Sequence, residues 1–189
     1  MIAGVDEVGR GCLAGPVVSA AVIFPDGFSH PLIKDSKKLS EKKRDEALKI
    51  IHENAISVSI GISEPLEIDQ INILQATFVS MKKAINGLSI VPTKLLIDGD
   101  KFPGHNGIPF ECIIKGDSKV QAISAASIVA KVARDQMMKD LAKEFPQYLW
   151  ESNVGYGTKD HMEAIEKNGL SKHHRKTFCS RFNSSNSLI

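Results

Sequence analysis

The sequence has few cysteines and none of the common cysteine or histidine spacings for a metal. Cys12, Cys112 and Cys179 lie far apart and form no C-x-x-C pair, which argues against a disulfide framework and against a zinc ribbon. The six histidines show no H-E-x-x-H spacing. No apolar run approaches membrane-spanning length, and no signal-like segment is present. These absences predict a soluble protein of a reducing compartment, the cytoplasm, with no membrane partner.

The sequence also has little net charge. It carries 24 Lys and Arg against 22 Asp and Glu, a formal charge of +2, which does not by itself indicate a nucleic-acid partner. The distribution of charge along the chain is more informative. Residues 34–49 hold seven basic and four acidic side chains, and residues 119–181 hold eleven basic and seven acidic side chains. Basic segments on both sides of acidic motifs suit a polyanion bound around a metal site. On charge alone, solvated helix faces remain the favoured explanation.

Hydrophobic periodicity predicts an α/β protein. Apolar runs and period-2 alternation predict strands at 2–8, 17–24, 56–63, 95–98 and 110–115. Helical spacing and capping signals predict helices at 40–53, 73–86, 119–145 and from the cap Thr158 to Gly169. Strand runs followed by helices favour a mixed sheet covered by helices.

The small residues of ISVSIGIS, at 56–63, suggest outward positions on a strand that is not buried on both faces. We expect residues 1–182 to form one domain, with a helical C-terminal part from about residue 146. The polar tail at 183–189, NSSNSLI, is expected to be disordered.

Four acidic residues occur where a sheet builds a site. Asp6 and Glu7 end an apolar strand, Asp98 ends LLID, and Asp117 follows FECIIKG. Asp98-Gly99 also suits a turn, and Asp117 alone suits a helix N-cap better. Carboxylates without Cys or His ligands favour a hard cation, Mg²⁺ or Mn²⁺, and two such ions about 3.5–4 Å apart suit phosphoryl chemistry.

Two alternatives concern the strand that carries Asp6 and Glu7. Neighbouring strand residues point to opposite faces. Both can therefore serve one site only if the strand ends or distorts there, or if the site extends around the edge of the strand. Gly9 and Gly11 permit a distortion.

Residues 9–14 also match G-x-G-x-x-A, but that dinucleotide motif must open a helix, and Pro16 with VVSAAVIF follows instead. We therefore reject a dinucleotide site.

Several stretches, taken in this order, resemble the ribonuclease HII family, the bacterial type 2 ribonucleases H. They span residues 2 to about 178, and DEVGRG together with the SAASIVAKVARD helix is highly specific. The stretches are DEVGRG (6–11), AGPVV (14–18), DSKKLS (35–40), INILQAT (71–77), LLIDGD (95–100), KGDSKVQAISAASIVAKVARD (115–135), GYGTKDH (155–161) and HHRKTF (173–178).

The resemblance implies the ribonuclease H-like fold, a five-stranded mixed sheet flanked by helices with a helical C-terminal part. It implies that Asp6, Glu7, Asp98 and Asp117 are catalytic and hold two Mg²⁺ or Mn²⁺ ions when substrate is bound. The implied activity is hydrolysis of the RNA strand of RNA–DNA hybrids, with 5′-phosphate ends. Incision 5′ to single ribonucleotides in duplex DNA is also implied, and with it ribonucleotide excision repair, RNA primer removal and action as a monomer.

The resemblance also implies substrate contacts, with less weight than it gives to the four acidic residues. Gly9-Arg10-Gly11 resembles the loop that reads the 2′-hydroxyl at the RNA–DNA junction, although two glycines also suit a simple turn. Tyr156 resembles the tyrosine that stacks on the sugar after the ribonucleotide, although such a tyrosine is otherwise a loop anchor. Ser36 and Lys37 resemble phosphate contacts.

Asn72 and Gln75 resemble contacts to the hybrid at a helix start, where Asn72 could equally be a cap. For Lys131, His174 and Arg175 a structural or surface role is favoured over a catalytic one. Two other functions stay open from sequence: a hybrid-binding module without turnover, against which the four acidic residues argue, and a different metal nuclease on the same fold.

Overall fold

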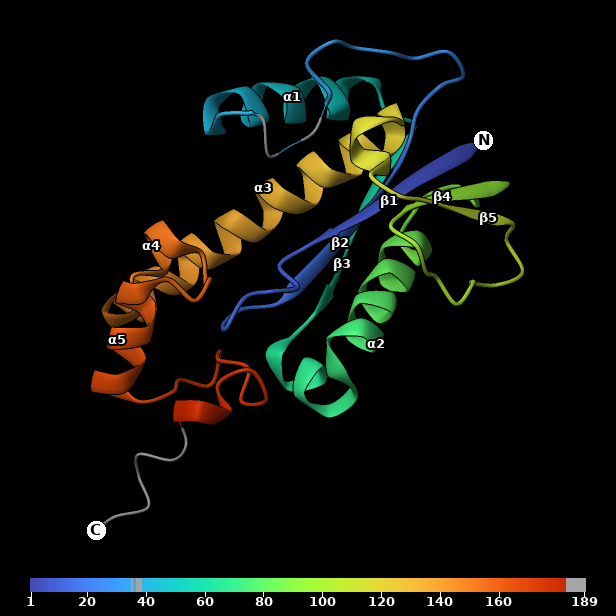
Figure 1. Cartoon of the computed structure of the whole chain (residues 1–189). Coiled ribbons are helices and arrows are strands. Elements are labelled where there is room, and N and C mark those ends of the chain that lie inside the picture. The colour runs from blue at the N-terminus through green and yellow to red at the C-terminus, as the bar shows by residue number, and fades with distance from the viewer. Residues whose placement is uncertain (35, 37–38, 183–189) are drawn as a thin grey trace.

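A five-stranded mixed sheet forms the centre of the computed structural model, which describes residues 1–34, 36 and 39–182 (Figure 1). The strand order is β3-β2-β1-β4-β5. The central β1 pairs with β2 antiparallel and with β4 parallel, while β3 is antiparallel to β2 and β5 is parallel to β4. The strands are β1 Ile2–Val8, β2 Val17–Ile23, β3 Ser57–Ser63, β4 Lys94–Asp98 and β5 Phe110–Ile113. The predicted mixed sheet is confirmed; the last strand is two residues shorter than predicted, and the other strand ends agree to within one residue.

Helices cover both faces of this sheet. On one face, α1 and α3 pack on Val18, Ala20 and Val22 of β2. On the other, α2 packs on the alternate residues Ala21 and Ile23, so β2 is buried on both sides (Figure 1). The helices are α1 Glu41–Asn54, α2 Pro65–Asn86, α3 Gln121–Glu144, α4 Trp150–Asn153 and α5 Lys159–Asn168, with 3₁₀ turns η2 Gly116–Ser118 and η3 Pro146–Tyr148.

The capping residues predict most helix ends. The hydroxyl of Ser40 accepts the N–H of Lys43 at the start of α1, and that of Thr158 accepts the N–H of His161 at the start of α5. The second helix is the exception, because it begins at Pro65 rather than at 73. Asn72 interrupts α2 with φ 67° and ψ 164°, so the predicted start matches only the second segment of this helix.

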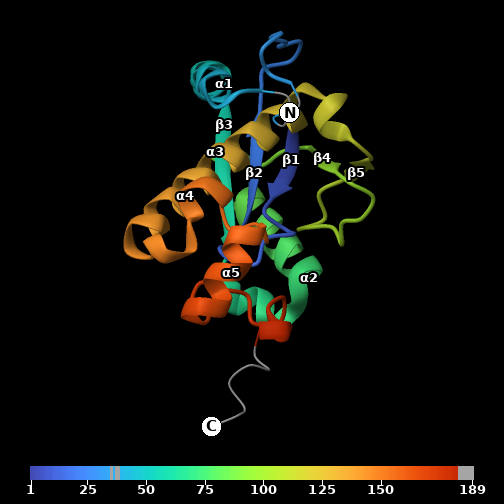
Figure 2. The same cartoon turned by 60° about the vertical axis from the view of Figure 1, so that its left-hand side comes forward.

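The C-terminal part packs around a separate aromatic and aliphatic cluster. Tyr148 and Trp150 stack there with ring centroids 5.0 Å apart, next to Met138 of α3 and Ile165 of α5. In Figure 2, α4 and α5 lie together at the end of α3. The short α4 was not predicted, since four residues are too few for a periodic pattern. The predicted disorder at 183–189 lies outside the described residues.

The small residues of β3 face inward, against our expectation. Ser57, Gly61 and Ser63 are buried, whereas Ile60 is exposed. The reason is the close approach of α2: a Cβ on Gly61 would lie 1.9 Å from the Ser80 carbonyl oxygen. Small side chains therefore set the distance between this strand and α2.

We predict that Gly61→Ala lowers the free energy of unfolding by about 1–3 kcal/mol, because the added methyl forces backbone apart. Ile60→Thr, an exposed and β-branched replacement on the same strand, should change it by less than about 0.5 kcal/mol. Urea unfolding measures both. Equal stability of Gly61→Ala and wild type would contradict the close packing of β3 on α2.

Candidate active site

The parallel pairing of β1 with β4 brings two carboxylates together. Val5 pairs with Ile97, so the next residues, Asp6 and Asp98, end up side by side on neighbouring strands. Ala3 and Val5 pack towards α2, so the alternate Asp6 faces α3. Asp6 is 5% exposed, and its pKa is raised well above the ordinary value by burial and then by the charges of Glu7 and Asp98. Its ionised form therefore lacks a counter-charge.

Glu7 lies at the same end of the sheet without any distortion of β1. The pairing with β2 stays regular, Glu7 opposite Ser19 and Val8 opposite Val18, so the two carboxylates keep opposite faces. β1 ends at Val8, directly after them, so the strand-end alternative is the one that the structure fits. Burial raises the pKa of Glu7, Arg10 at 3.3 Å lowers it, and Asp98 raises it again. The charge of Asp98 therefore acts on Glu7 although the two side chains lie on different strands.

Asp98 fixes the turn that carries the fourth carboxylate. Its Oδ1 accepts the backbone N–H groups of Gly116 at 2.6 Å and Asp117 at 3.4 Å. Asp117 lies in η2 and is 8% exposed, and its carbonyl accepts the Ser124 hydroxyl at 2.7 Å. The N-cap of α3 is Val120, so the alternative of Asp117 as that cap is wrong.

These donors suit a hard cation. All are carboxylates, which Mg²⁺ and Mn²⁺ prefer, and the raised pKa values of Asp6 and Glu7 mark negative charge that a cation would neutralise. Across the described residues, no three or more His, Cys, Asp or Glu side chains are already gathered as a ligand set.

A serine chain leads from Asp6 to the segment before α1. The Ser127 hydroxyl of α3 hydrogen-bonds the Asp6 carboxylate and also lies 2.9 Å from the Ser36 hydroxyl. Ser36 is buried, so its side chain, which the family resemblance assigns to a phosphate, is turned into the protein. Lys37, the other residue expected to contact a phosphate, lies outside the described residues.

The loop after β1 contacts the loop around Tyr156. The Gly155 carbonyl accepts the N–H groups of Leu13 at 2.8 Å and Ala14 at 3.2 Å. Tyr156 itself is 41% exposed, and the Arg134 guanidinium carbon lies 5.9 Å from its ring centroid. The structure therefore joins the two loops that the sequence could only treat separately.

Two buried arginines hold these loops. Arg134 donates to the carbonyls of Ala14, Pro16 and Val154 at 2.8–3.0 Å. Arg175 donates to the carbonyls of Gly9, Arg10 and Gly15 at 2.6–3.0 Å, and burial lowers its pKa to about 10, which leaves it charged at neutral pH. The structural role favoured for Arg175 fits these bonds.

Sequence reasoning missed Arg134, although its pattern was informative. It lies among Ala126, Ala130, Met138 and Ala142, the buried i+4 stripe of α3. A single arginine in an apolar stripe signals a buried cation bonded to backbone.

The other residues expected at the site have local partners. The Asn72 side chain accepts the N–H groups of Leu74 at 3.0 Å and Gln75 at 3.2 Å, so the capping alternative describes this helix start. Gln75 is exposed beside it. Lys131 pairs with Asp135 at 2.7 Å.

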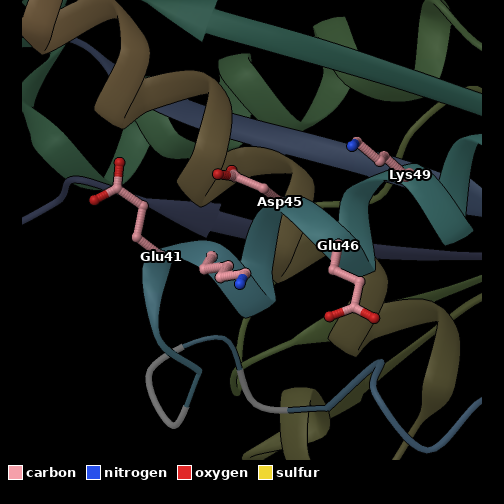
Figure 3. Close-up of a pocket in the computed structure, with 5 residues that line it drawn as sticks. Glu41, Asp45, Glu46 and Lys49 are labelled. Atoms are coloured by element: carbon pink, nitrogen blue, oxygen red, sulfur yellow. The ribbon is translucent and has the colours of Figure 1, made fainter.

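A hollow of about 700 Å³ lies elsewhere, along α1 (Figure 3). It is lined by Glu41, Lys42, Asp45, Glu46 and Lys49, all from one helix, and in Figure 3 the Glu46 side chain points away from Asp45. Among the described residues no second element contributes to that lining, so the carboxylates at the ends of β1 and β4 remain the stronger site.

Carboxylates on adjacent strands of a mixed sheet with this order define a nuclease of the ribonuclease H-like class. A family model described as "Ribonuclease HII" matches residues 3–185. The chain is 53% identical over 175 residues to ribonuclease HII of Porphyromonas gingivalis, covering 93% of this chain and 87% of that protein. It is 50% identical over 178 residues to ribonuclease HII of Neisseria meningitidis serogroup B, covering 94% and 92%. The chain therefore belongs to the ribonuclease HII family.

The fold agrees with this assignment. The crystal structure of ribonuclease H2 from Pyrococcus horikoshii matches with a TM-score of 0.79 and 26% sequence identity, covering 97% of this chain and 99% of that one. As a member of the family, the chain is a divalent-metal-dependent endonuclease that degrades the RNA strand of RNA–DNA hybrids. Within the part that the structure describes, no helix is long and apolar enough to cross a membrane.

We predict that Asp6→Asn stabilises the metal-free protein at pH 7 by on the order of 1 kcal/mol. Because the pKa of Asp6 is raised in the folded state, its ionisation opposes folding, and the gain should vanish below about pH 4, near the ordinary value of 3.8. Thermal unfolding with and without Mn²⁺ measures this.

Mn²⁺ should raise the melting temperature of wild type more than that of Asp6→Asn, since binding to the native state stabilises it. The exposed Asp26→Asn is the matched control and should behave as wild type does. A less stable metal-free Asp6→Asn would contradict the unneutralised charge at this position.

Proposed function

We propose that Asp6, Glu7, Asp98 and Asp117 together hold two Mg²⁺ or Mn²⁺ ions while an RNA–DNA hybrid is bound. The observation that supports this most is the pairing of β1 with β4, which places Asp6 beside Asp98, with Glu7 and the turn of Asp117 at the same sheet end. Two such ions activate a water and stabilise the leaving oxygen of a phosphodiester.

The protein's own part is to hold these carboxylates in place. Ser127 orients Asp6, and the N–H groups of Gly116 and Asp117 orient Asp98. Because both N–H groups bond to Oδ1, the Asp98 carboxylate keeps Oδ2 for a cation. Cleavage on the 5′ side of the scissile phosphate would leave 5′-phosphate ends.

The substrate is proposed to be read by the two joined loops. Backbone groups of Gly9-Arg10-Gly11 would sense the 2′-hydroxyl, because glycine allows close approach. The half-exposed ring of Tyr156 would stack on the next sugar. Such a reader would support incision 5′ to a single ribonucleotide in duplex DNA, and hence ribonucleotide excision repair as well as primer removal.

Further contacts are proposed to position the duplex. Lys37 is assigned to a phosphate, and Asn72 and Gln75 to the hybrid at the break in α2. Ser36 is assigned to a phosphate as well, although its hydroxyl is buried against that of Ser127 in the free protein. We further propose that the protein is a single domain that acts as a monomer in the cytoplasm.

We predict that Asp98→Asn lowers kcat on a uniform RNA–DNA hybrid roughly 100-fold or more while the Kd for the hybrid changes little. Asparagine keeps an acceptor for the N–H groups of η2, so charge is lost with little change of shape. The exposed Asp100→Asn, two residues along, is the matched control and should retain activity. Turnover by purified Asp98→Asn at the wild-type rate would remove Asp98 from the proposed site.

Substituting Tyr156 should separate recognition from cleavage. Tyr156→Ala should lose more kcat/KM on a duplex with one ribonucleotide than on a uniform hybrid, where the following sugar is itself a ribose. Tyr156→Phe keeps the ring face and should retain most of the activity on both substrates. Steady-state kinetics on the two substrates measures the ratio. Equal fractional losses for Tyr156→Ala would show that Tyr156 supports the loop only.

A further inference from the structure

Two buried histidines that the proposed chemistry does not use lie directly behind Tyr156. His161 of α5 and His174 of the C-terminal segment are 0% and 1% exposed. They lie in the same aromatic cluster as Tyr148 and Trp150, in the region of α4 and α5 in Figure 2. Every ring nitrogen of the pair has a hydrogen-bond partner, which fixes where the protons are.

The partners of His161 determine its tautomer. The Trp150 indole can only donate, and its Nε1 lies 3.0 Å from Nε2 of His161. Nε2 is therefore an acceptor, and the ring proton is on Nδ1. That Nδ1–H lies 2.8 Å from the backbone carbonyl oxygen of Tyr156 and donates to it.

His174 completes the chain of donors. Its Nδ1 accepts the backbone N–H of Ser171 at 2.9 Å, so its proton is on Nε2. Nε2–H of His174 then donates to Nε2 of His161 at 3.1 Å, so the one lone pair of that nitrogen is shared between His174 and Trp150. The bonds run in one direction, from Ser171 through both imidazoles to the Tyr156 carbonyl.

This arrangement requires both rings to be neutral. A second proton on His161 would put Nε2–H against the N–H groups of Trp150 and His174, and a second proton on His174 would put Nδ1–H against the backbone N–H of Ser171. Burial lowers the pKa of His161, and burial with the nearby His161 and His173 lowers the pKa of His174 to about 4. The titratable groups that face the pair from the elements packed against it are Tyr148 and His173.

The pair also connects to the other proposed reading loop. Residues Ala14 and His174 form an antiparallel bridge, and Arg175 N–H donates to the Leu13 carbonyl at 2.8 Å. The Tyr156 carbonyl accepts a second bond from the Thr158 N–H, also at 2.8 Å. The C-terminal segment that carries His174 therefore bonds to the loop after β1, and the Tyr156 carbonyl is held by two donors.

We propose that His161 is a positioning residue for Tyr156, held in its Nδ1–H form by Trp150 and His174. It sets how the ring is presented to the substrate and takes no part in the metal-dependent chemistry. This inference rests on the proposed role of Tyr156 in reading the ribonucleotide.

The kinetic test compares three variants on the two substrates named above. His161→Leu removes the donor, whereas the amide nitrogen of His161→Asn is as many bonds from Cα as Nδ1 and can replace it. His173→Leu is the matched control, because His173 packs on Phe145 and Trp150 in the same cluster without a side-chain bond to Tyr156.

His161→Leu should lower kcat/KM on the single-ribonucleotide duplex about 3- to 10-fold more than on the uniform hybrid, the effect of one lost hydrogen bond. His161→Asn should restore the wild-type ratio, and His173→Leu should keep it. Equal losses of His161→Leu on both substrates, or the same ratio change in His173→Leu, would overturn the proposal.

Tyr156→Ala separates this inference from the function on which it rests. If Tyr156→Ala changes the substrate ratio and His161→Leu does not, the positioning role fails while the reading role stands. If Tyr156→Ala leaves the ratio unchanged, the reading role itself fails.

A spectroscopic measurement on the wild-type protein needs no variant to fold. Long-range ¹H–¹⁵N spectra of the imidazoles should show His161 as the neutral Nδ1–H tautomer and His174 as the neutral Nε2–H tautomer from pH 8 down to pH 5. An imidazolium at either position at pH 6, or the opposite tautomer of His161, would contradict the proposal.

Discussion

Repulsion between the buried carboxylate of Asp6 and the partly buried carboxylate of Asp98, on adjacent parallel strands, is the constraint on which this structure depends. The register of β1 with β4 places Asp6 beside Asp98, and Glu7 is near enough to raise the pKa of Asp6 further. Such a cluster costs folding free energy until a cation neutralises it. In the proposed function, the same charge that destabilises the metal-free protein is what attracts a divalent cation to this end of the sheet.

The helix α3 contacts both the carboxylates and the loops beside them. Its Ser127 contacts Asp6, its Ser124 holds the turn of Asp117, and its Arg134 binds the loops beside the site. One long helix thus connects the carboxylates to the loops proposed to read the substrate. The histidine pair extends this support to the far side of Tyr156.

Local sequence predicted the elements well, and contacts between distant residues much less well. Ser40, Thr158 and Pro146 marked helix ends because capping and proline chemistry act over a few residues. The inward direction of Gly61 depends on α2, and the break at Asn72 on a local backbone conformation, so neither was read from periodicity. The four acidic residues stood out in the sequence, but their proximity required the family resemblance, because pairing of β1 with β4 is set by the whole sheet.

The central claim is that these carboxylates jointly hold the catalytic metal. Anomalous diffraction from Mn²⁺ in crystals of the protein with an uncleavable RNA–DNA hybrid tests it most directly. The account predicts two Mn²⁺ peaks about 4 Å apart, ligated by oxygens of Asp6, Glu7, Asp98 and Asp117. Mn²⁺ bound elsewhere, with the hybrid in place and these carboxylates free of metal, would contradict it.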